Sequence, residues 1–184
     1  MKPSHVALAI QHAVTVDRPL FVWGPPGVGK SDTVRHVATA TGVQVMDFRA
    51  ALRDAVDIMG LPGAADGITF YNQPAGFPRA GAGLLFLDEM NSAPAQTQAA
   101  LYQLILDRRV GDYVLPEGWR IIAAGNRMND RGVVHRMPDP LVDRFIHVDF
   151  EPDMADWCLW ALTSGVKPEV VAFYRELYDE VKER

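Results

Sequence analysis

The stretch Gly24-Pro25-Pro26-Gly27-Val28-Gly29-Lys30-Ser31 decides the fold that this sequence predicts. It follows an apolar run at 20–23 and precedes a segment at 31–40 with helical spacing. A glycine-rich turn between a strand and a helix, ending in Gly-Lys-Ser, matches the phosphate loop G-x-x-x-x-G-K-[ST]. Glycines let backbone N–H groups approach phosphate oxygens, and the helix start adds its positive dipole end. We therefore expect these eight residues to bind a nucleoside triphosphate.

Two residues at the end of this stretch have individual predicted roles. Lys30 is expected to reach the β and γ phosphates, and Ser31 to bind Mg²⁺ through its hydroxyl. The alternative is an ordinary glycine-rich turn between a strand and a helix. The eight matching residue types and the correct flanks on both sides favour the phosphate loop.

Composition limits the class of protein. A chain of 184 residues with 48% hydrophobic and 22% charged residues predicts one globular α/β domain, with few residues remaining for a second domain. The net charge of −5 argues against a broad basic surface for duplex nucleic acid. The single cysteine, Cys158, fits a reducing cytosol, and no apolar run approaches transmembrane length. We therefore expect a cytoplasmic protein that binds no membrane and whose partner is a protein in preference to nucleic acid.

The remaining pattern alternates strands with helices, which predicts a doubly wound sheet. The fold class is an α/β P-loop NTPase, a three-layer sandwich around a five-stranded parallel sheet. Ser4 is the expected N-cap of the first helix. Strands are predicted at 20–23, 43–48, 84–87, 120–124 and 145–150, and helices at 4–15, 31–40, 94–108 and about 140–144.

Three segments stand outside this alternation. Glycines and prolines interrupt residues 53–83, which predicts either a functional excursion with a short strand at 68–71 or a solvated loop. Residues 110–119 predict a hairpin or a pair of turns. Two amphipathic helices are expected at 153–164 and 168–183. We divide the chain into a nucleotide-binding α/β domain at 1–150 and a helical segment, the start of a short or truncated lid, at 151–184.

Polar side chains follow two of the predicted buried strands, where ligands of parallel sheets bind. Asp88 and Glu89 end the apolar run 84–87, in the manner of a Walker B element. Asp88 is expected to help hold Mg²⁺, and Glu89 to orient the water that attacks the γ phosphate. Asn126 follows the next strand, where its amide could hydrogen-bond the γ phosphate or that water. The alternatives are acidic residues that begin a loop and a turn-forming asparagine after Gly125.

Taken together, these motifs resemble the AAA+ ATPases, in particular the MoxR-like branch (a dynein-related AAA domain), from about residue 19 to 150. Glu89-Met90-Asn91 with Ala93-Pro94, and Asp143-Arg144-Phe145, resemble segments of that branch. The resemblance implies ATP as the nucleotide, Asn126 as sensor 1, and Arg144 as an arginine finger. It also implies a ring of copies, often a hexamer, in which one copy's arginine completes the next copy's site. The insertion at 53–83 corresponds to a surface used for partner contact, and clients of the branch often carry a von Willebrand A-type domain.

Several arginines compete for two predicted roles. Arg131 and Arg136 are alternatives to Arg144 as the finger, and Arg144 could instead pair with Asp143 or Asp149 at the surface. Family members carry a helical lid with a sensor-2 arginine. The 34 residues at 151–184 leave that residue unassigned, with Arg175 and Arg184 as poor choices.

The predicted function is a Mg²⁺-dependent ATPase module that remodels or activates a protein partner. One alternative is a non-hydrolysing nucleotide switch, and another is a small-molecule kinase.

Overall fold

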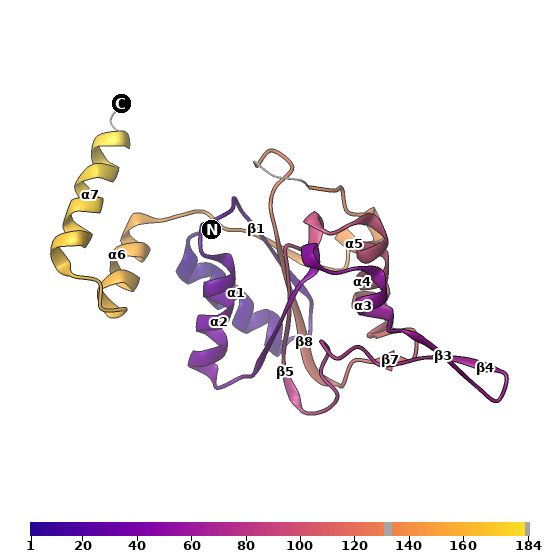
Figure 1. Ribbon diagram of the computed structural model, residues 1–184. Coiled ribbons are helices and arrows are strands. Elements are labelled where there is room, and N and C mark those ends of the chain that lie inside the picture. The colour runs from indigo at the N-terminus through magenta and orange to yellow at the C-terminus, as the bar shows by residue number, and fades with distance from the viewer. Residues whose placement is uncertain (131–133, 183–184) are drawn as a thin grey trace.

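A five-stranded parallel sheet forms the centre of the chain (Figure 1). The computed structural model describes residues 1–130 and 134–182. The strand order is β2-β5-β8-β1-β9, and each neighbouring pair is parallel. The strands are β1 Leu20–Trp23, β2 Val45–Arg49, β5 Ala82–Asp88, β8 Gly118–Gly125 and β9 Ile146–Asp149.

Helices cover both faces of this sheet, and alternate side chains of each strand point to opposite faces. Leu20 and Val22 of β1 belong to the core on one face, whereas Phe21 between them belongs to the core on the other. The first face is covered by α1 Pro3–Thr15 and α2 Lys30–Thr41, and the second by α3 Ala55–Met59, α4 Ala95–Asp107 and α5 Asp139–Val142. The predicted three-layer α/β sandwich is therefore confirmed.

The predicted element boundaries need small corrections. Ser4 does not cap the first helix, because that helix begins at Pro3 and Lys2 occupies the N-cap position. The backbone N–H of Ser4 instead donates to the Asp156 carboxylate at 2.7 Å. The second strand begins two residues later than predicted, and the two central strands are longer, at 82–88 and 118–125.

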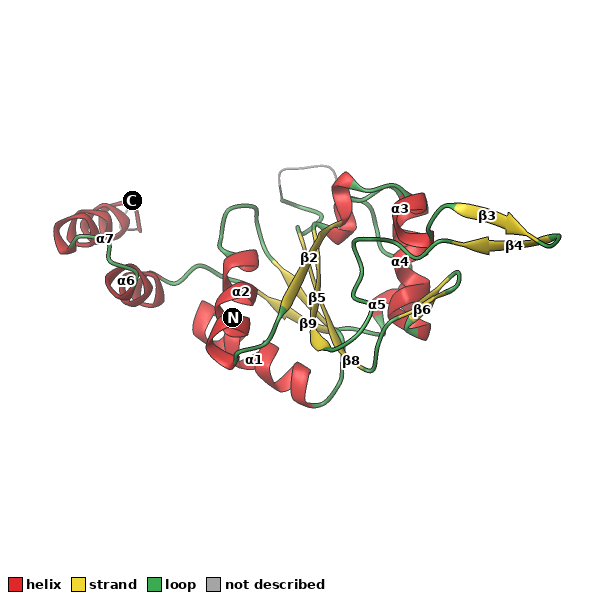
Figure 2. Ribbon diagram, turned by 60° about the horizontal axis from the view of Figure 1, so that its bottom comes forward, coloured by secondary structure: helices red, strands yellow, loops and turns green. Residues whose placement is uncertain are grey.

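The glycine-rich region contains a β-hairpin that projects from the body of the domain (Figure 2). The hairpin pairs β3 Pro62–Ala65 with β4 Ile68–Tyr71, after the 3₁₀ turn η1 Ala50–Leu52 and α3. A Cβ atom on Gly60 would lie 1.8 Å from the Asn72 carbonyl oxygen, so only glycine fits there. A second hairpin, β6 Arg109–Val110 with β7 Tyr113–Val114, holds the first, because Asp112 accepts from the Tyr71 N–H at 2.6 Å.

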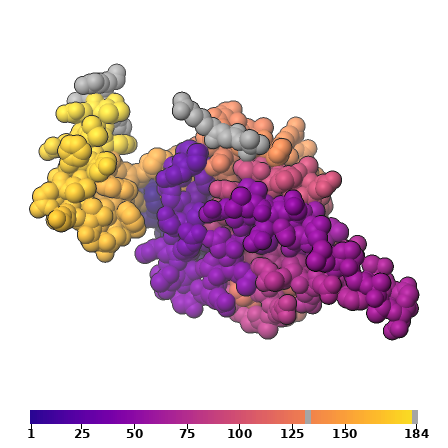
Figure 3. All heavy atoms as spheres, in the orientation of Figure 1, coloured from indigo at the N-terminus to yellow at the C-terminus, as the bar shows by residue number. Residues whose placement is uncertain are grey.

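Two helices, α6 Met154–Thr163 and α7 Pro168–Lys182, extend beyond α1 and α2 on the side of the molecule away from the hairpin (Figure 3). Asp156 of α6 joins them to the domain, because its carboxylate accepts hydrogen bonds from Lys2 Nζ at 3.2 Å and from the Ser4 N–H at 2.7 Å. Several of their large apolar side chains remain exposed, including Leu159 at 67% and Phe173 at 61%. Within the described part of the chain, every helix is too short or too polar to cross a membrane.

Candidate nucleotide-binding site

The predicted phosphate loop connects β1 to α2 at the carboxyl edge of the sheet. Gly27 and Gly29 have φ angles of 82° and 94°, a backbone region that L side chains rarely adopt, which explains glycine at both positions. Gly24 packs against the end of the domain, since a Cβ there would lie 3.1 Å from the Phe150 carbonyl oxygen. Gly29 is the N-cap of α2, so the unpaired N–H groups of this helix face the loop. The loop thus has the glycine positions and the helix start that a phosphate cradle requires.

The ammonium of Lys30 lies inside this loop, and the residue as a whole is only 9% exposed. Nζ donates to the carbonyl oxygens of Gly24 at 2.7 Å and Pro25 at 2.9 Å, and to Asn126 Oδ1 at 3.1 Å. Burial lowers the pKa of Lys30, although the carboxylates of Asp88, Asp130 and Glu89 act in the opposite direction. Three oxygen acceptors therefore surround Nζ, and phosphate oxygens suit the same donor.

Ser31 and Asp88, the two predicted Mg²⁺ ligands, lie in direct contact. Ser31 Oγ donates to Asp88 Oδ2 at 2.6 Å, and the other carboxylate oxygen accepts the backbone N–H of Glu89 at 2.9 Å. A hydroxyl and a carboxylate are the hard oxygen ligands that Mg²⁺ takes from proteins, with the rest supplied by phosphates and water. Among the described residues, no cluster of three or more His, Cys, Asp or Glu is placed to hold a metal by itself. The pair therefore fits a cation that shares its ligands with a nucleotide.

Glu89 follows β5 with its backbone in the left-handed region, at φ 53°. A non-glycine residue held there costs of order 1 kcal/mol or more, and such residues concentrate at functional sites. This conformation separates β5 from the 3₁₀ turn η2 Met90–Ser92. Within the described chain the Glu89 carboxylate forms no hydrogen bond or ion pair, so it is available to a water molecule.

Asn91 contributes to the site in a way that the sequence did not predict. Its side chain is 1% exposed and forms two bonds with the backbone of Asn126. Nδ2 donates to the Asn126 carbonyl at 2.7 Å, and Oδ1 accepts the Asn126 N–H at 3.2 Å. Asn91 therefore fixes the backbone from which the Asn126 amide extends toward Lys30. The only sequence signal was the Glu89-Met90-Asn91 segment, which gives no hint of this contact.

Arg144, the predicted finger, lies apart from the phosphate loop of its own chain. It precedes β9, which runs parallel to β1, so it lies at the amino edge of the sheet and the loop at the carboxyl edge. A four-residue strand such as β1 spans roughly 13 Å. Its guanidinium forms no ion pair with Asp143, Asp149 or any other described residue, and Asp149 is paired instead with Arg127 at 2.9 Å. The fold thus gathers five of the predicted site residues at the phosphate loop and leaves Arg144 apart from them. The five are Lys30, Ser31, Asp88, Glu89 and Asn126.

The other arginines with a predicted role divide into Arg131 and Arg136, the alternatives to Arg144 as the finger, and Arg175 and Arg184, the choices for sensor 2. Arg136 is exposed and pairs with Asp139 at 3.2 Å on the same segment. Arg131 and Arg184 lie outside the described residues. Arg175 lines a cavity between α6 and α7, together with Cys158 and Asp179.

A hydrogen bond also links the strand before the loop to the segment that carries Arg144. Trp23 Nε1 donates to His147 Nδ1 at 2.8 Å, and His147 Nε2 lies 2.8 Å from the Val142 carbonyl oxygen. Since Nδ1 accepts a hydrogen bond from Trp23, it carries no hydrogen, and the hydrogen of the ring lies on Nε2, which donates to the Val142 carbonyl oxygen. The rings of Trp23 and His147 stack with centroids 5.9 Å apart. Local sequence patterns carry no signal for this pair, whose residues are 124 positions apart.

A parallel sheet in this order, with a glycine-rich loop after β1, defines an α/β P-loop NTPase domain. The chain belongs to the AAA domain family (dynein-related subfamily), whose model matches residues 19–145. The prediction of an AAA+ ATPase is thereby confirmed at the level of the family.

Individual relatives cover parts of the chain. The chain is 34% identical to the ATPase family gene 2 protein homolog B of Homo sapiens over 113 residues. This match covers 54% of the chain and 14% of that protein. A crystal structure of a candidate ATPase from Cytophaga hutchinsonii superposes with a TM-score of 0.62 at 19% identity, covering 89% of this chain and 51% of that one. The structure of NtrX from Brucella abortus superposes with a TM-score of 0.57 at 19% identity, covering 90% of this chain and 43% of NtrX. The chain thus spans about half or less of the proteins that it matches, and the structural likenesses show the fold alone.

Proposed function

We propose that this chain is a Mg²⁺-ATP-hydrolysing AAA+ module in which two copies complete each active site. The observation that carries the proposal is the division of the predicted site between two edges of the sheet. Lys30, the Ser31–Asp88 pair, Glu89 and Asn126 converge at the carboxyl edge. Arg144 extends from the amino edge with no partner among the described residues. An arginine placed in this way can serve the nucleotide of an adjacent copy but not that of its own.

In this proposal each residue at the carboxyl edge acts on a bound nucleotide. The backbone of residues 24–29 and Lys30 hold the phosphates, and Ser31 with Asp88 holds the cation. Bound Mg²⁺ would offset the negative charge of the β and γ phosphates. Glu89 orients and polarises the attacking water, and the amide of Asn126 fixes its position. Such positioning accounts for most of the catalysis in phosphoryl transfer.

Arg144 of the adjacent copy supplies the last positive charge. In related phosphoryl-transfer enzymes a guanidinium in this role raises the rate by about 10³–10⁵. Contacts that repeat head to tail form a ring when the rotation between copies closes, and we propose such a ring as the active form.

The proposed partner of the ring is a protein client in the cytoplasm, with a von Willebrand A-type domain as one candidate. The β3–β4 hairpin is the proposed contact surface, because it extends from the domain and exposes Ile68 at 69% and Phe70 at 41%. We further propose that residues 1–150 form the nucleotide-binding unit and 151–184 the beginning of a lid.

ATP turnover per chain, measured across a wide range of protein concentration, tests the proposal. Turnover per chain should rise with concentration and level off as the copies associate, because an isolated copy lacks the arginine. A value near zero at every concentration, with ATP bound, would indicate a nucleotide switch instead. Transfer of phosphate to a small acceptor, without free phosphate as product, would indicate a kinase.

A further inference from the structure

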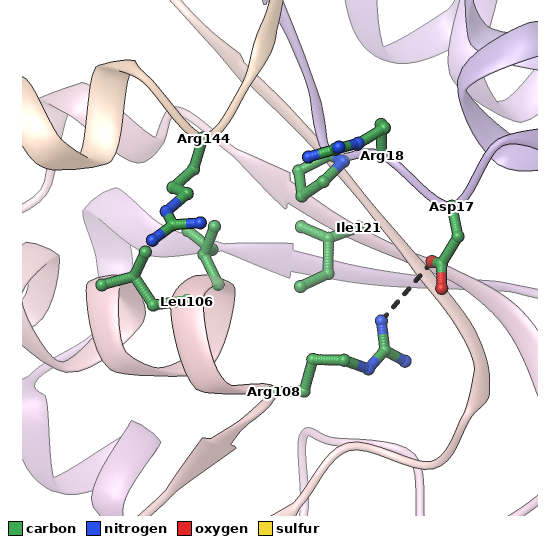
Figure 4. A pocket seen from close by; sticks show the side chains of 8 residues that line it. Asp17, Arg18, Leu106, Arg108, Ile121 and Arg144 are labelled. Atoms are coloured by element: carbon green, nitrogen blue, oxygen red, sulfur yellow. Dashed lines mark ion pairs between the residues drawn. The ribbon is translucent and has the colours of Figure 1, made fainter.

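A cavity of about 190 Å³ opens at the amino edge of the sheet, next to Arg144 (Figure 4). Three arginines line it, Arg18 from the segment before β1, Arg108 from the end of α4, and Arg144 from the segment before β9. Asp17 lines it as well, and Ile121 is among its apolar residues. Since one water molecule occupies about 30 Å³ in the liquid, the cavity is several times larger than a single water molecule.

The positive charges around this cavity are unequally compensated. Asp17 Oδ1 lies 3.7 Å from Arg108 Nη1 and 3.1 Å from Arg120 Nε, so its one negative charge is shared by two arginines. Arg108 also donates from Nη2 to the carbonyl oxygens of Pro116 and Trp119, at 3.1 and 2.7 Å. By contrast, the guanidinium groups of Arg18 and Arg144 have no hydrogen bond or ion pair with the described residues. In a chain of net charge −5, two uncompensated guanidinium groups therefore line one cavity.

The backbone places these two arginines side by side. Leu20 of β1 pairs with Ile146 of β9. Arg18 lies two residues before Leu20, and Arg144 lies two residues before Ile146. The Ile146 N–H donates to the Pro19 carbonyl at 2.8 Å, which extends the pairing toward the arginines. Their proximity therefore follows from strand register and does not depend on one side-chain rotamer.

We propose that Arg18 and Arg144 together form a binding site for a phosphoryl oxyanion, and that Arg18 is a second phosphate-contacting arginine beside Arg144. The planar guanidinium fork matches phosphate oxygens, and two forks from the segments that precede the adjacent strands β1 and β9 would bind one such group from two directions. The phosphoryl group has two candidate sources, the nucleotide held by an adjacent copy and free inorganic phosphate. The first source rests on the proposed function, in which Arg144 acts on that nucleotide.

Mixing of variants tests the first source. The acceptor is the double variant Arg18→Gln/Arg144→Ala, which keeps its phosphate loop but offers neither arginine. The donor is Lys30→Ala, which keeps both arginines but loses its own nucleotide. We expect the donor to restore turnover to the acceptor, and Lys30→Ala/Arg18→Gln to restore about tenfold to a hundredfold less, as for loss of a hydrogen bond to a charged group. The matched control donor is Lys30→Ala/Arg79→Ala, which removes an exposed arginine that lines neither cavity and should restore as much as Lys30→Ala alone.

Calorimetric titration of inorganic phosphate into the Lys30→Ala protein tests the second source, with Lys30→Ala/Arg18→Gln and Lys30→Ala/Arg79→Ala as comparisons. Binding that only Arg18→Gln abolishes, without any effect of Arg18 on mixed turnover, assigns the site to free phosphate. If Arg18→Gln changes neither measurement, the oxyanion site is refuted, while restoration by the Lys30→Ala donor still upholds the role of Arg144. If the Lys30→Ala donor restores no turnover, completion of the site by a second copy is refuted. The oxyanion site then stands if Arg18→Gln abolishes phosphate binding, and it is refuted if Arg18→Gln leaves phosphate binding unchanged.

Discussion

Replacement of Asn91 by leucine should separate the positioning of Asn126 from nucleotide binding. The change removes two hydrogen bonds, of 2.7 and 3.2 Å, and leaves the backbone N–H and C=O of Asn126 without these partners. An unsatisfied buried polar group costs about 1–3 kcal/mol. Asn126 is half-buried, so water can partly replace the lost bonds, and we expect a total loss of about 2–4 kcal/mol in the free energy of unfolding.

The catalytic effect should be larger than the effect on binding. A displacement of about 1 Å in a positioning group can cost about 10²-fold in rate, so we expect the Asn91→Leu variant to lose about that factor in kcat. The KM for ATP should change little, because the loop backbone and Ser31 are untouched. Denaturant titration measures the stability, and phosphate release at temperatures where the variant is folded measures kcat and KM.

Thr97 provides a matched control for this experiment. It is also 1% exposed, and its hydroxyl donates to the Arg53 carbonyl at 2.9 Å, away from the phosphate loop. Thr97→Val should lose stability and leave kcat unchanged. A parent kcat in folded Asn91→Leu, or an equal loss of kcat in Thr97→Val, would refute a positioning role for Asn91.

Burial lowers the pKa of Lys30 below 10.5, and bound phosphates should raise it. ATP affinity should therefore fall as the pH rises toward 10.5. An ATP affinity that stays constant from pH 7 to 10 would contradict this role of the Lys30 charge. Burial raises the pKa of Tyr113 to about 12 from 10.0, so the free energy of unfolding should decrease by roughly 2–3 kcal/mol between these pH values. Tyr113→Phe should abolish that decrease in alkaline denaturant titrations, and an unchanged pH profile argues against it. Phe70→Ser on the hairpin should leave ATP turnover unchanged but weaken copurification of the native partner, and equal recovery of that partner excludes the hairpin as its contact.

Much of the fold was predictable because its signals are local. The strand–loop–helix pattern around Gly24–Ser31 and the apolar run 84–87 each depend on neighbouring residues. The convergence of Asp88, Glu89 and Asn126 was also predictable, since parallel strands place their carboxyl ends at one edge. The contacts of Asn126 with Lys30 and of Asp88 with Ser31 agree with that expectation, and the catalytic roles stay predictions.

The missed contacts depend on tertiary structure. Asn91 meets Asn126 only because β5 and β8 are neighbours in the sheet, which no local pattern encodes. The same holds for Arg18, whose position beside Arg144 results from the pairing of β1 with β9. Ser4 was a reasonable N-cap by residue type, but the Asp156 carboxylate from a distant helix binds its N–H.

The hairpin in the glycine-rich region was predicted only as one short strand at 68–71. Its first strand, Pro62–Ala65, is rich in small residues and lacks β-branched side chains, so it carries little strand propensity. Phe70 packs over Gly63, where a Cβ would lie 2.6 Å from the ring, and this contact requires the paired structure. Sequence patterns therefore located the excursion without revealing its form.

The central claim is that this site hydrolyses ATP with Glu89 as the residue that orients water. The most direct test compares Glu89→Gln with the parent chain, measuring ATP affinity and single-turnover phosphate release on the same samples. We predict ATP affinity close to that of the parent and phosphate release slower by about 10²–10⁴-fold, the usual contribution of a general base. Phosphate release at the parent rate from the Glu89→Gln protein would contradict the account.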